Sequence, residues 1–237
     1  MLGIVIPVYN ESDNIKKLFD AIAKDIHCEM EVRVVYDMDE DTTLPVVERI
    51  RGDYSFPIVL SKNKFGRGAL NAIHSGMVDS AGEAVLVMMA DLSDSLWVVD
   101  DMYAKIHNEG YDVVCGSRYM KGGKQHGGPA FKGFLSRMAG LSMHLLSGIP
   151  THDVTNSFKM YRKSFLDTLT IESDGGFEIG MEITVKAYLG GYKVGEVPAE
   201  WFDRDGGESH FRLWAWLPHY LKWYFRCIFG KKQPRTV

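Results

Sequence analysis

Short apolar runs alternate with segments of helical spacing over the first half of the chain, and no other feature limits the fold as strongly. The runs lie at 2–8, 32–37, 57–61, 83–91 and 111–116. Each is almost continuously apolar, as in strands that are buried on both faces. Strands that alternate with helices over connections of this length form mostly parallel sheets covered by helices. The sequence therefore predicts an α/β fold.

The second half of the chain is less regular, but nothing in it marks a domain boundary. It contains a glycine-rich loop at 121–129, a helix at 130–147, an edge strand within 153–165 that enters a helix, a helix at 177–191 and a strand at 192–202. No repeat or low-complexity linker separates these segments. We therefore predict one domain over residues 1–211, with a basic aromatic tail at 212–237 that belongs to the same domain.

The cysteines and the apolar segments bear on where such a chain works. Cys28, Cys115 and Cys227 are odd in number and far apart, which argues against a disulfide framework or a zinc site and fits a reducing cytoplasm. The first residues lack a basic leader and a cleavage site, and no stretch reaches 18 uncharged apolar residues. We expect a cytoplasmic protein with neither a signal peptide nor a spanning helix.

Polar side chains follow four of the predicted strands. They are Tyr9 to Glu11, Asp37 to Asp41, Asp91 to Asp94, and Gly116 to Arg118. Ligands of open parallel sheets bind beyond the carboxyl ends of the strands. The sequence therefore predicts that these side chains form one site.

The acids at these strand ends suggest a nucleotide and a metal. Asp91 ends a buried strand, where a carboxylate is costly unless a cation meets it, and a divalent metal that bridges a nucleoside diphosphate would supply one. Helix capping by Ser93 or Asp94 explains the same pattern equally well. Asp37 is the candidate contact to a ribose or a base edge, with a solvated capping turn as the alternative.

Basic residues near the same strand ends suggest phosphate groups. Arg67 lies beside glycines that open a helix, where backbone amides and the helix dipole favour an anion, although a plain turn would look the same. Arg118, Arg137 and Arg204 each follow a loop on the predicted binding side. Surface arginines are usually only solvated, but around one cleft they would bind phosphates through forked hydrogen bonds.

Seven segments together carry a family resemblance from residue 3 to about 211. They are IVIPVYNE, VVYDMDEDTT, NKFGRGAL, MADLSD, GSRY, DVTNSFKMYRK and EVPAEWFDRDGGESHF. In this order they resemble the family 2 glycosyltransferases of GT-A fold, most closely the dolichol-phosphate mannose synthase group. The resemblance implies a Rossmann-like nucleotide-diphospho-sugar transferase.

The resemblance also implies roles for single residues. Pro7, Tyr9, Glu11 and Asp37 match nucleotide contacts, and with Arg67 and Asp91 they form the expected donor site. Asp91 and Ser93 match the element that holds Mg²⁺ or Mn²⁺, with Asp94 as a further ligand. Arg118, Arg137 and Arg204 match arginines that contact donor and acceptor phosphates.

Three positions depart from the family pattern. Met89 stands where the first metal-site acid is expected, and its thioether suits neither Mg²⁺ nor Mn²⁺. Asp91 would then coordinate with Asp94, water and the diphosphate, since Mg²⁺ often binds one carboxylate plus phosphates. Tyr36 replaces one acid of a doubled pair, which bears on base choice, and His210 stands where a lysine is usual.

A lipid phosphate is the expected acceptor. A phosphate monoester is already anionic at neutral pH and needs no general base, whereas a hydroxyl acceptor does. Arg118, Arg137 and Lys132 would dock that phosphate, while Asp91, Arg118 and Arg204 would act on the departing diphosphate. Glu182 is the nearest candidate for a base, or for a partner that orients an arginine.

The tail suggests a membrane surface. All 31 acidic residues lie at or before Glu208, and the last 26 residues combine basic and aromatic side chains. Such residues favour the headgroup region of a bilayer. A core helix or an oligomer interface would give the same pattern. We expect a C-terminal amphipathic aromatic helix at the cytoplasmic face of a membrane and no nucleic-acid partner. The sequence does not determine the oligomeric state.

The expected reaction is inverting transfer of a hexose, with mannose favoured, from GDP-mannose or else a UDP-hexose to a polyprenyl phosphate. Two alternatives stay open. One keeps the fold but uses a saccharide hydroxyl as acceptor, as in surface polysaccharide synthesis. The other, prompted by Met89, is a catalytically silent subunit that binds nucleotide sugars.

Overall fold

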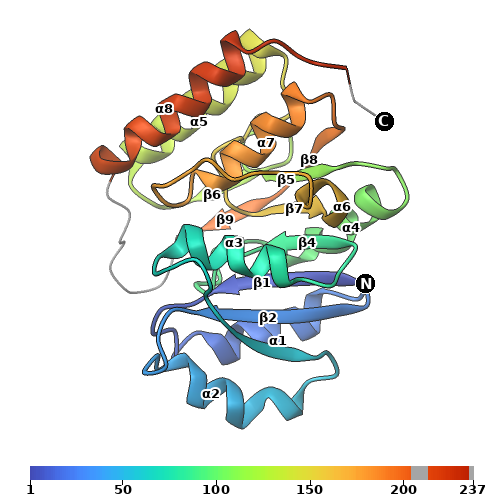
Figure 1. Ribbon diagram of the computed structural model, residues 1–237, viewed down its shortest axis with the longest axis vertical. Coiled ribbons are helices and arrows are strands. Elements are labelled where there is room, and N and C mark those ends of the chain that lie inside the picture. Colours follow the sequence, from blue (N-terminus) through green and yellow to red (C-terminus); the bar gives the residue numbers. More distant parts are fainter. Residues whose placement is uncertain (204–212, 235–237) are drawn as a thin grey trace.

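The computed structural model describes residues 1–203 and 213–234, with helices on both faces of a central sheet (Figure 1). The first half runs β1 (Leu2–Pro7), α1 (Ile15–Asp25), β2 (Met30–Tyr36), α2 (Thr43–Ile50), β3 (Ile58–Lys62), α3 (Ala69–Asp79), β4 (Ala84–Val87), α4 (Val99–His107) and β5 (Val113–Ser117). The second half runs β6 (Lys124–His126), α5 (Ala130–Ser147), β7 (Lys159–Arg162), α6 (Lys163–Leu166), α7 (Ile179–Leu189), β8 (Val194–Pro198), β9 (Glu200–Phe202) and α8 (Leu213–Phe229).

Seven strands form the main sheet in the order β3-β2-β1-β4-β7-β5-β8, and the predicted α/β fold with a mostly parallel sheet is confirmed. Strand β7 is the antiparallel member and pairs with β4 on one side and β5 on the other. The predicted edge strand is therefore an interior strand. The polar residues around it suggested an edge, but Lys159 is buried there because its ammonium group donates to the carbonyls of Val154 (2.6 Å) and Gly180 (3.1 Å).

The structure contains a second, two-stranded sheet that the sequence did not predict. Strand β6 falls inside the predicted glycine-rich loop and pairs in parallel with β9. The predicted strand at 192–202 is divided between β8 in the main sheet and β9 in this small one. The predicted helix at 130–147 has the bounds of α5.

The sheet separates two apolar cores, because successive side chains of a strand point to opposite faces. On β1, Ile4 and Ile6 belong to the core beneath α1, whereas Val5 belongs to the core that contains residues of α3 and α7. Strands buried on both faces explain the continuous apolar runs of the sequence.

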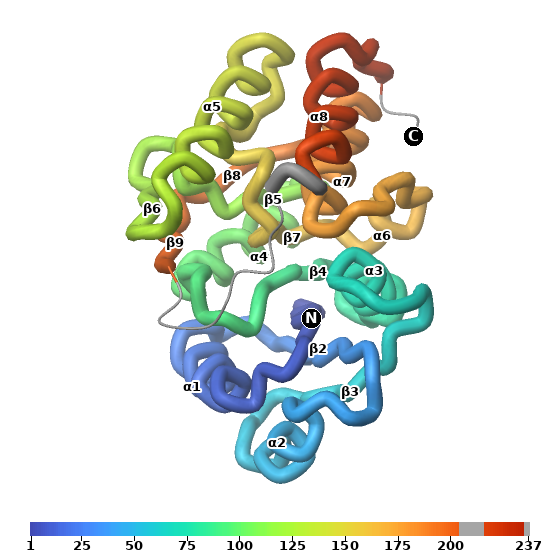
Figure 2. Tube along the Cα trace, turned by 90° about the vertical axis from the view of Figure 1, so that its left-hand side faces the viewer, coloured from blue at the N-terminus to red at the C-terminus, as the bar shows by residue number. Residues whose placement is uncertain are grey.

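Helices α5 and α8 lie side by side at the end of the molecule away from α2 (Figures 1 and 2). A third apolar cluster joins them to α7, with Met143, Trp223 and Cys227 among its buried members. The predicted C-terminal helix is therefore present and packs on the rest of the fold. In the described part of the chain, no helix has the length and apolar character required to cross a bilayer.

Tyr161 of β7 provides a test of the core. Its side chain is fully buried, and its hydroxyl has no hydrogen-bond partner among the described residues. An unsatisfied buried hydroxyl costs roughly 1–3 kcal/mol, so we expect Tyr161→Phe to raise the free energy of unfolding by about 1 kcal/mol. Urea unfolding with an unchanged slope measures it.

The matched control for this prediction is Tyr103→Phe. The Tyr103 hydroxyl accepts from the N-terminal ammonium group (3.0 Å) and donates to Glu83. Its removal should therefore lower the stability slightly. Equal losses in the two variants would show that the Tyr161 hydroxyl is satisfied after all.

Candidate active site at the carboxyl edge of the sheet

The sheet topology brings the four polar strand ends to one edge. Strand β1 is parallel to β2 and β4, and β5 runs in the direction of β4 because β7 is antiparallel to both. The segments that follow β1, β2, β4 and β5 therefore lie at the same edge of the sheet, as the sequence predicted.

The loop after β1 is fixed by a buried acid that the sequence analysis did not single out. Asp41 is almost fully buried and accepts the backbone N–H groups of Asn10 (3.1 Å) and Thr43 (2.8 Å). The Thr43 hydroxyl in turn accepts the N–H of Glu11 (2.9 Å). Asn10 has a φ of 57°, so the loop is sharply turned. The capping interpretation of this acidic turn thus fits Asp41, although nothing in the sequence distinguishes it from its neighbours.

The expected donor residues of this loop differ in exposure. Pro7 and Glu11 are half-buried, and the Glu11 carboxylate accepts from the Asn14 amide (2.8 Å). Tyr9 is 58% exposed at the carboxyl end of β1. Its predicted nucleotide contact stays a prediction.

Asp37 lies against the turn that opens α3. Its carboxylate accepts from the Asn63 amide (2.7 Å) and from the N–H of Gly68 (2.8 Å). Arg67 precedes Gly68 in this turn, and its side chain is exposed. The structure thus brings together two of the predicted donor residues, Asp37 and Arg67, which lie 30 positions apart in the sequence.

The segment after β4 carries the predicted metal ligands. The Asp91 carboxylate accepts the N–H of Ser93 (3.2 Å), and the Ser93 carbonyl accepts the N–H of Phe202 in β9 (2.8 Å). Asp94 is buried. Burial, and after it the charge of Asp91, raises the pKa of the Asp94 carboxyl to about 7.

These residues fit a divalent cation. A positive charge shared by the half-buried Asp91 and the buried Asp94 would stabilise both carboxylates, and oxygen donors suit Mg²⁺ and Mn²⁺. Met89 is half-buried and packs against the apolar cluster that contains Val5 and Val35. The position of the missing acid is therefore used for packing, and Asp91 and Asp94 are the carboxylates of this segment that remain for a metal.

Arg118, at the end of β5, is held by a buried ion pair. Its guanidinium group donates to both carboxylate oxygens of Asp153 (2.7 and 3.0 Å) and to the hydroxyl of Ser136 (3.0 Å). Burial alone would raise the pKa of Asp153, but the guanidinium group outweighs it and holds that pKa below its usual range. The charge of Arg118 also lowers the pKa of Asp94, against the larger effect of burial.

The other predicted phosphate contacts come from α5 and from the segment after β9. Arg137 is exposed and Lys132 half-buried on α5, the helix that also supplies Ser136. Arg137 is near enough to Tyr119 for its charge to lower the pKa of the phenol, against the larger effect of burial. Arg204 and His210 lie outside the described residues.

The comparison with known families determines the class of this site. The model of the family described as glycosyl transferase family 2 matches residues 3–170, which is more than half of the chain. The chain belongs to glycosyltransferase family 2. The resemblance expected from the seven sequence segments is thereby confirmed.

Relatives of this glycosyltransferase include enzymes named for lipid-phosphate acceptors. A dolichol-phosphate mannosyltransferase from Pyrococcus furiosus is 30% identical over 233 residues, which cover 94% of this chain and 64% of that protein. A polyprenol monophosphomannose synthase from Mycolicibacterium smegmatis is 27% identical over 214 residues, which cover 87% of this chain and 79% of the relative. The glycosyltransferase therefore spans less than two thirds of the Pyrococcus protein.

Solved structures share the fold. A mannosyltransferase from Pyrobaculum calidifontis in complex with GDP-Man and Mn²⁺ has a TM-score of 0.70 at 17% identity, over 98% of this chain and 65% of that one. Glucosyl-3-phosphoglycerate synthase from Mycobacterium tuberculosis in complex with UDP has a TM-score of 0.68 at 12% identity, over 98% of this chain and 81% of that one. The glycosyltransferase thus has the GT-A fold that the sequence predicted.

Glu182 of the glycosyltransferase has a structural position. It is fully buried in α7, and its carboxylate accepts the N–H groups of Glu172 (2.7 Å) and Ser173 (2.8 Å) and the ammonium group of Lys186 (2.6 Å). The expectation that Glu182 orients an arginine is wrong, because backbone amides and a lysine occupy its oxygens. A sequence pattern cannot distinguish an acid that faces a loop from one that faces a cleft.

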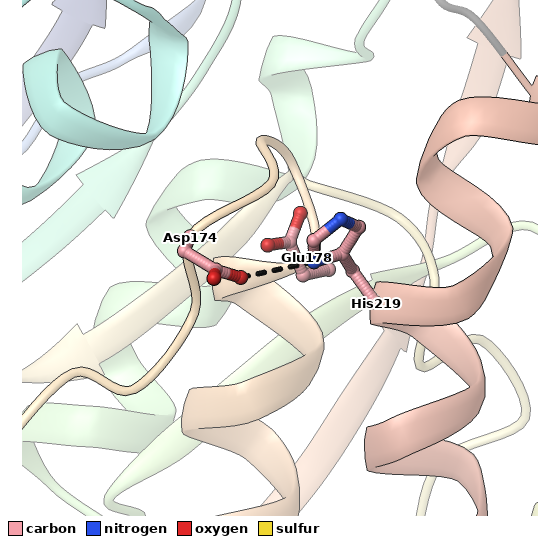
Figure 3. A group of neighbouring side chains, drawn as sticks. All are labelled: Asp174, Glu178 and His219. Carbon is pink, nitrogen blue, oxygen red and sulfur yellow. Dashed lines mark hydrogen bonds and ion pairs between the residues drawn. The ribbon is translucent and has the colours of Figure 1, made fainter.

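A second group of polar side chains joins the start of α7 to α8, with Asp174, Glu178 and His219 pointing toward one another (Figure 3). His219 is hydrogen-bonded to Asp174 (2.9 Å). Glu178 accepts the N–H groups of Gly175 (2.7 Å) and Gly176 (2.5 Å) at the helix start. The bond from His219 to Asp174 thus links α8 to the segment before α7, while Glu178 binds the turn at the start of α7.

Proposed function

We propose that this glycosyltransferase moves a hexose, with mannose favoured, from a nucleoside diphosphate sugar to a polyprenyl phosphate, with inversion at the anomeric carbon. The names of the Pyrococcus and Mycolicibacterium relatives support the acceptor and the sugar. The GDP-Man in the Pyrobaculum structure supports GDP-mannose as the donor, and the UDP in the Mycobacterium structure keeps a UDP-hexose as the next candidate.

The observation that carries the proposal is the group of charged side chains after β4 and β5, two strands that run in the same direction. Asp91 and the buried Asp94 follow β4, and the largely buried Arg118 follows β5. A cation held by the acids and a guanidinium group beside it would neutralise phosphates from two sides. This arrangement favours a reaction in which a diphosphate departs and a second phosphate attacks.

The roles of the chain's own residues follow from their positions. Asp91, with Asp94 and Ser93, would hold Mg²⁺ or Mn²⁺, which stabilises the charge that develops on the leaving diphosphate. Pro7, Tyr9, Glu11, Asp37 and Arg67 would bind the nucleotide portion of the donor. Arg118, Arg137 and Lys132 would dock the acceptor phosphate, whose anionic oxygen attacks without a general base, and Arg204 would contact the leaving diphosphate.

A panel of donors and acceptors tests the proposal. Release of nucleoside diphosphate from GDP-mannose and UDP-glucose is measured with Mg²⁺ or Mn²⁺, in the presence of a polyprenyl phosphate or of a soluble oligosaccharide. We expect turnover that requires the lipid phosphate. Turnover with the oligosaccharide alone would favour the hydroxyl acceptor, and binding without turnover would favour the silent subunit.

The proposed membrane-binding surface consists of exposed apolar side chains on α5 and α8. Leu221, Phe225 and Phe229 are exposed on α8 at a spacing of four residues, which places them on one face. Phe131, Phe134, Met138, Leu145 and Leu146 are exposed large apolar side chains of the neighbouring α5. We propose that these side chains enter the interfacial region of the cytoplasmic leaflet, where such faces bind in proportion to their apolar area.

We predict that exchanging Leu221, Phe225 and Phe229 together for serine lowers flotation with liposomes about 10-fold or more, because the apolar area that enters the bilayer is lost. Val78→Ser, an exposed apolar position on α3, is the control and should leave flotation unchanged. Surface exchanges are preferable to removal of α8, which would strip the buried Trp223 from the core. Unchanged flotation of the triple variant would contradict the membrane proposal.

A further inference from the structure

The turn between β3 and α3 is organised by one amide side chain. The Asn63 amide nitrogen donates to the carboxylate of Asp37 (2.7 Å) and to the carbonyl of Gly66 (2.5 Å). Its amide oxygen accepts the N–H of Phe65 (3.0 Å). Both hydrogens and one lone pair of the amide are therefore used. The partners also fix its orientation, since a reversed amide would place its oxygen against two other oxygens.

The conformation of this turn depends on glycine. Gly66 has a φ of 97° and Gly68 a φ of 117°, values that other residues rarely adopt. They allow the N–H of Gly68 to reach the second carboxylate oxygen of Asp37 (2.8 Å). Asp37 thus receives one hydrogen bond on each oxygen, one from Asn63 and one from the turn that Asn63 shapes.

The backbone of Asn63 is fixed as well. Its N–H donates to the carbonyl of Tyr36 at the end of β2 (2.9 Å), which continues the pairing of β2 with β3. The side chain of Asn63 therefore projects from a sheet edge that is held rigidly. Asp37, in contrast, follows its strand, and among the described residues Asn63 is the side chain that donates to its carboxylate.

We propose that Asn63 is a positioning residue for the donor nucleotide. Asn63 holds the Asp37 carboxylate in a fixed orientation and keeps the turn that bears Arg67 beside this carboxylate. A nucleoside diphosphate can then bind Asp37 and Arg67 in one fixed geometry. The inference rests on the proposed function, in which Asp37 and Arg67 bind the donor. Asn63 acts through these residues and takes no part in the chemical step.

Two exchanges of Asn63 test this role. Asn63→Asp keeps the size of the side chain but turns both donated bonds into contacts between oxygens, and Asn63→Ala removes them. We expect the affinity for GDP and UDP in calorimetric titration, and the KM for the sugar donor, to worsen about 10- to 100-fold. The kcat at saturating donor should stay within about threefold, because the interaction serves binding rather than the transition state.

The matched control is Asn108→Ala, at an exposed asparagine that ends α4 on another part of the fold. It should leave affinity and KM unchanged. A wild-type chain that binds neither GDP nor UDP would contradict the proposed function itself. Normal binding by the wild type and by Asn63→Asp alike would contradict the role of Asn63 alone.

Exchanging the carboxylate and the amide between positions 37 and 63 distinguishes an effect on carboxylate position from an effect on the conformation of the turn. In the double variant Asp37→Asn, Asn63→Asp, the hydrogen bond between the two side chains can form again with its direction reversed. The amide oxygen at position 37 can still accept from Gly68. We expect thermal stability to recover in part from that of Asn63→Asp, because the oxygen that faces the Gly66 carbonyl remains, while the nucleotide affinity stays low because the carboxylate has moved. Recovery of affinity together with stability would overturn the proposal.

Discussion

Asp91→Asn is expected to lower the rate of nucleoside diphosphate release from a sugar donor by about 1,000-fold. Loss of one group that stabilises the charge of a transition state lowers kcat by about this factor. The exchange keeps the shape of the side chain and removes its charge. The position has little redundancy, because Met89 carries no carboxylate and packs against the apolar core, which leaves Asp94 as the other acid of this segment. The rate is measured at saturating donor over a series of Mn²⁺ concentrations.

The control for this prediction is Asp101→Asn, an exposed acid of α4 remote from the carboxyl edge of the sheet. It should stay within about twofold of the wild-type rate. Mn²⁺ binding in the presence of GDP, followed by electron paramagnetic resonance, gives a second measurement that does not depend on turnover. An Asp91→Asn variant that binds Mn²⁺ and turns over at nearly the normal rate would contradict the assigned metal site.

The largest effect on stability is expected at Asp153. Its carboxylate is fully buried and binds Arg118 through two hydrogen bonds, while the Arg118 side chain is only 11% exposed. Asp153→Ala leaves a guanidinium group buried without its partner, and breaking such a pair costs about 3–5 kcal/mol. Urea unfolding at neutral pH measures the loss, with the slope as a check on two-state behaviour.

The comparison for Asp153 is an ion pair of the same type at the surface. Glu48 of α2 pairs with Arg51, which directly follows that helix (2.9 Å), and both side chains are 50% exposed. Glu48→Ala should cost less than about 1 kcal/mol, because exposed pairs contribute little. Replacing both Arg118 and Asp153 by leucine should be less harmful than Asp153→Ala, since no charge then stays buried alone. Similar losses for Asp153→Ala and Glu48→Ala would contradict this assignment.

Much of the fold follows from local patterns. Continuous apolar runs predict strands that are covered on both sides, and helical segments between them predict parallel pairing, as β1, β2, β3 and β4 show. Strand β7 could not be placed in this way. Its reversed direction and interior position follow from pairing with β4 and β5, and neither strand is adjacent to it along the chain.

The candidate site shows the same division. The strand-end positions of Asp37, Asp91 and Arg118 could be predicted because parallel strands end together. Their partners could not. Arg118 binds an acid 35 residues away, and Asp37 binds an amide 26 residues away. Asp41 shows that the roles of several acids in one turn cannot be assigned from the sequence, since only the fold distinguishes a buried carboxylate from a solvated neighbour.

The contacts of α8 have a consequence for how the glycosyltransferase would respond to ionic strength. Arg226 binds Glu172 (2.8 Å), Lys222 donates to the Glu172 carbonyl, and Lys232 lies over the ring of Tyr188. These contacts hold the three cations against the chain, so the proposed bilayer association rests mainly on the exposed apolar side chains of α5 and α8. We therefore expect physiological salt, which screens charges over about 8 Å, to leave bilayer association intact. Zwitterionic vesicles should then recruit the protein nearly as well as anionic ones.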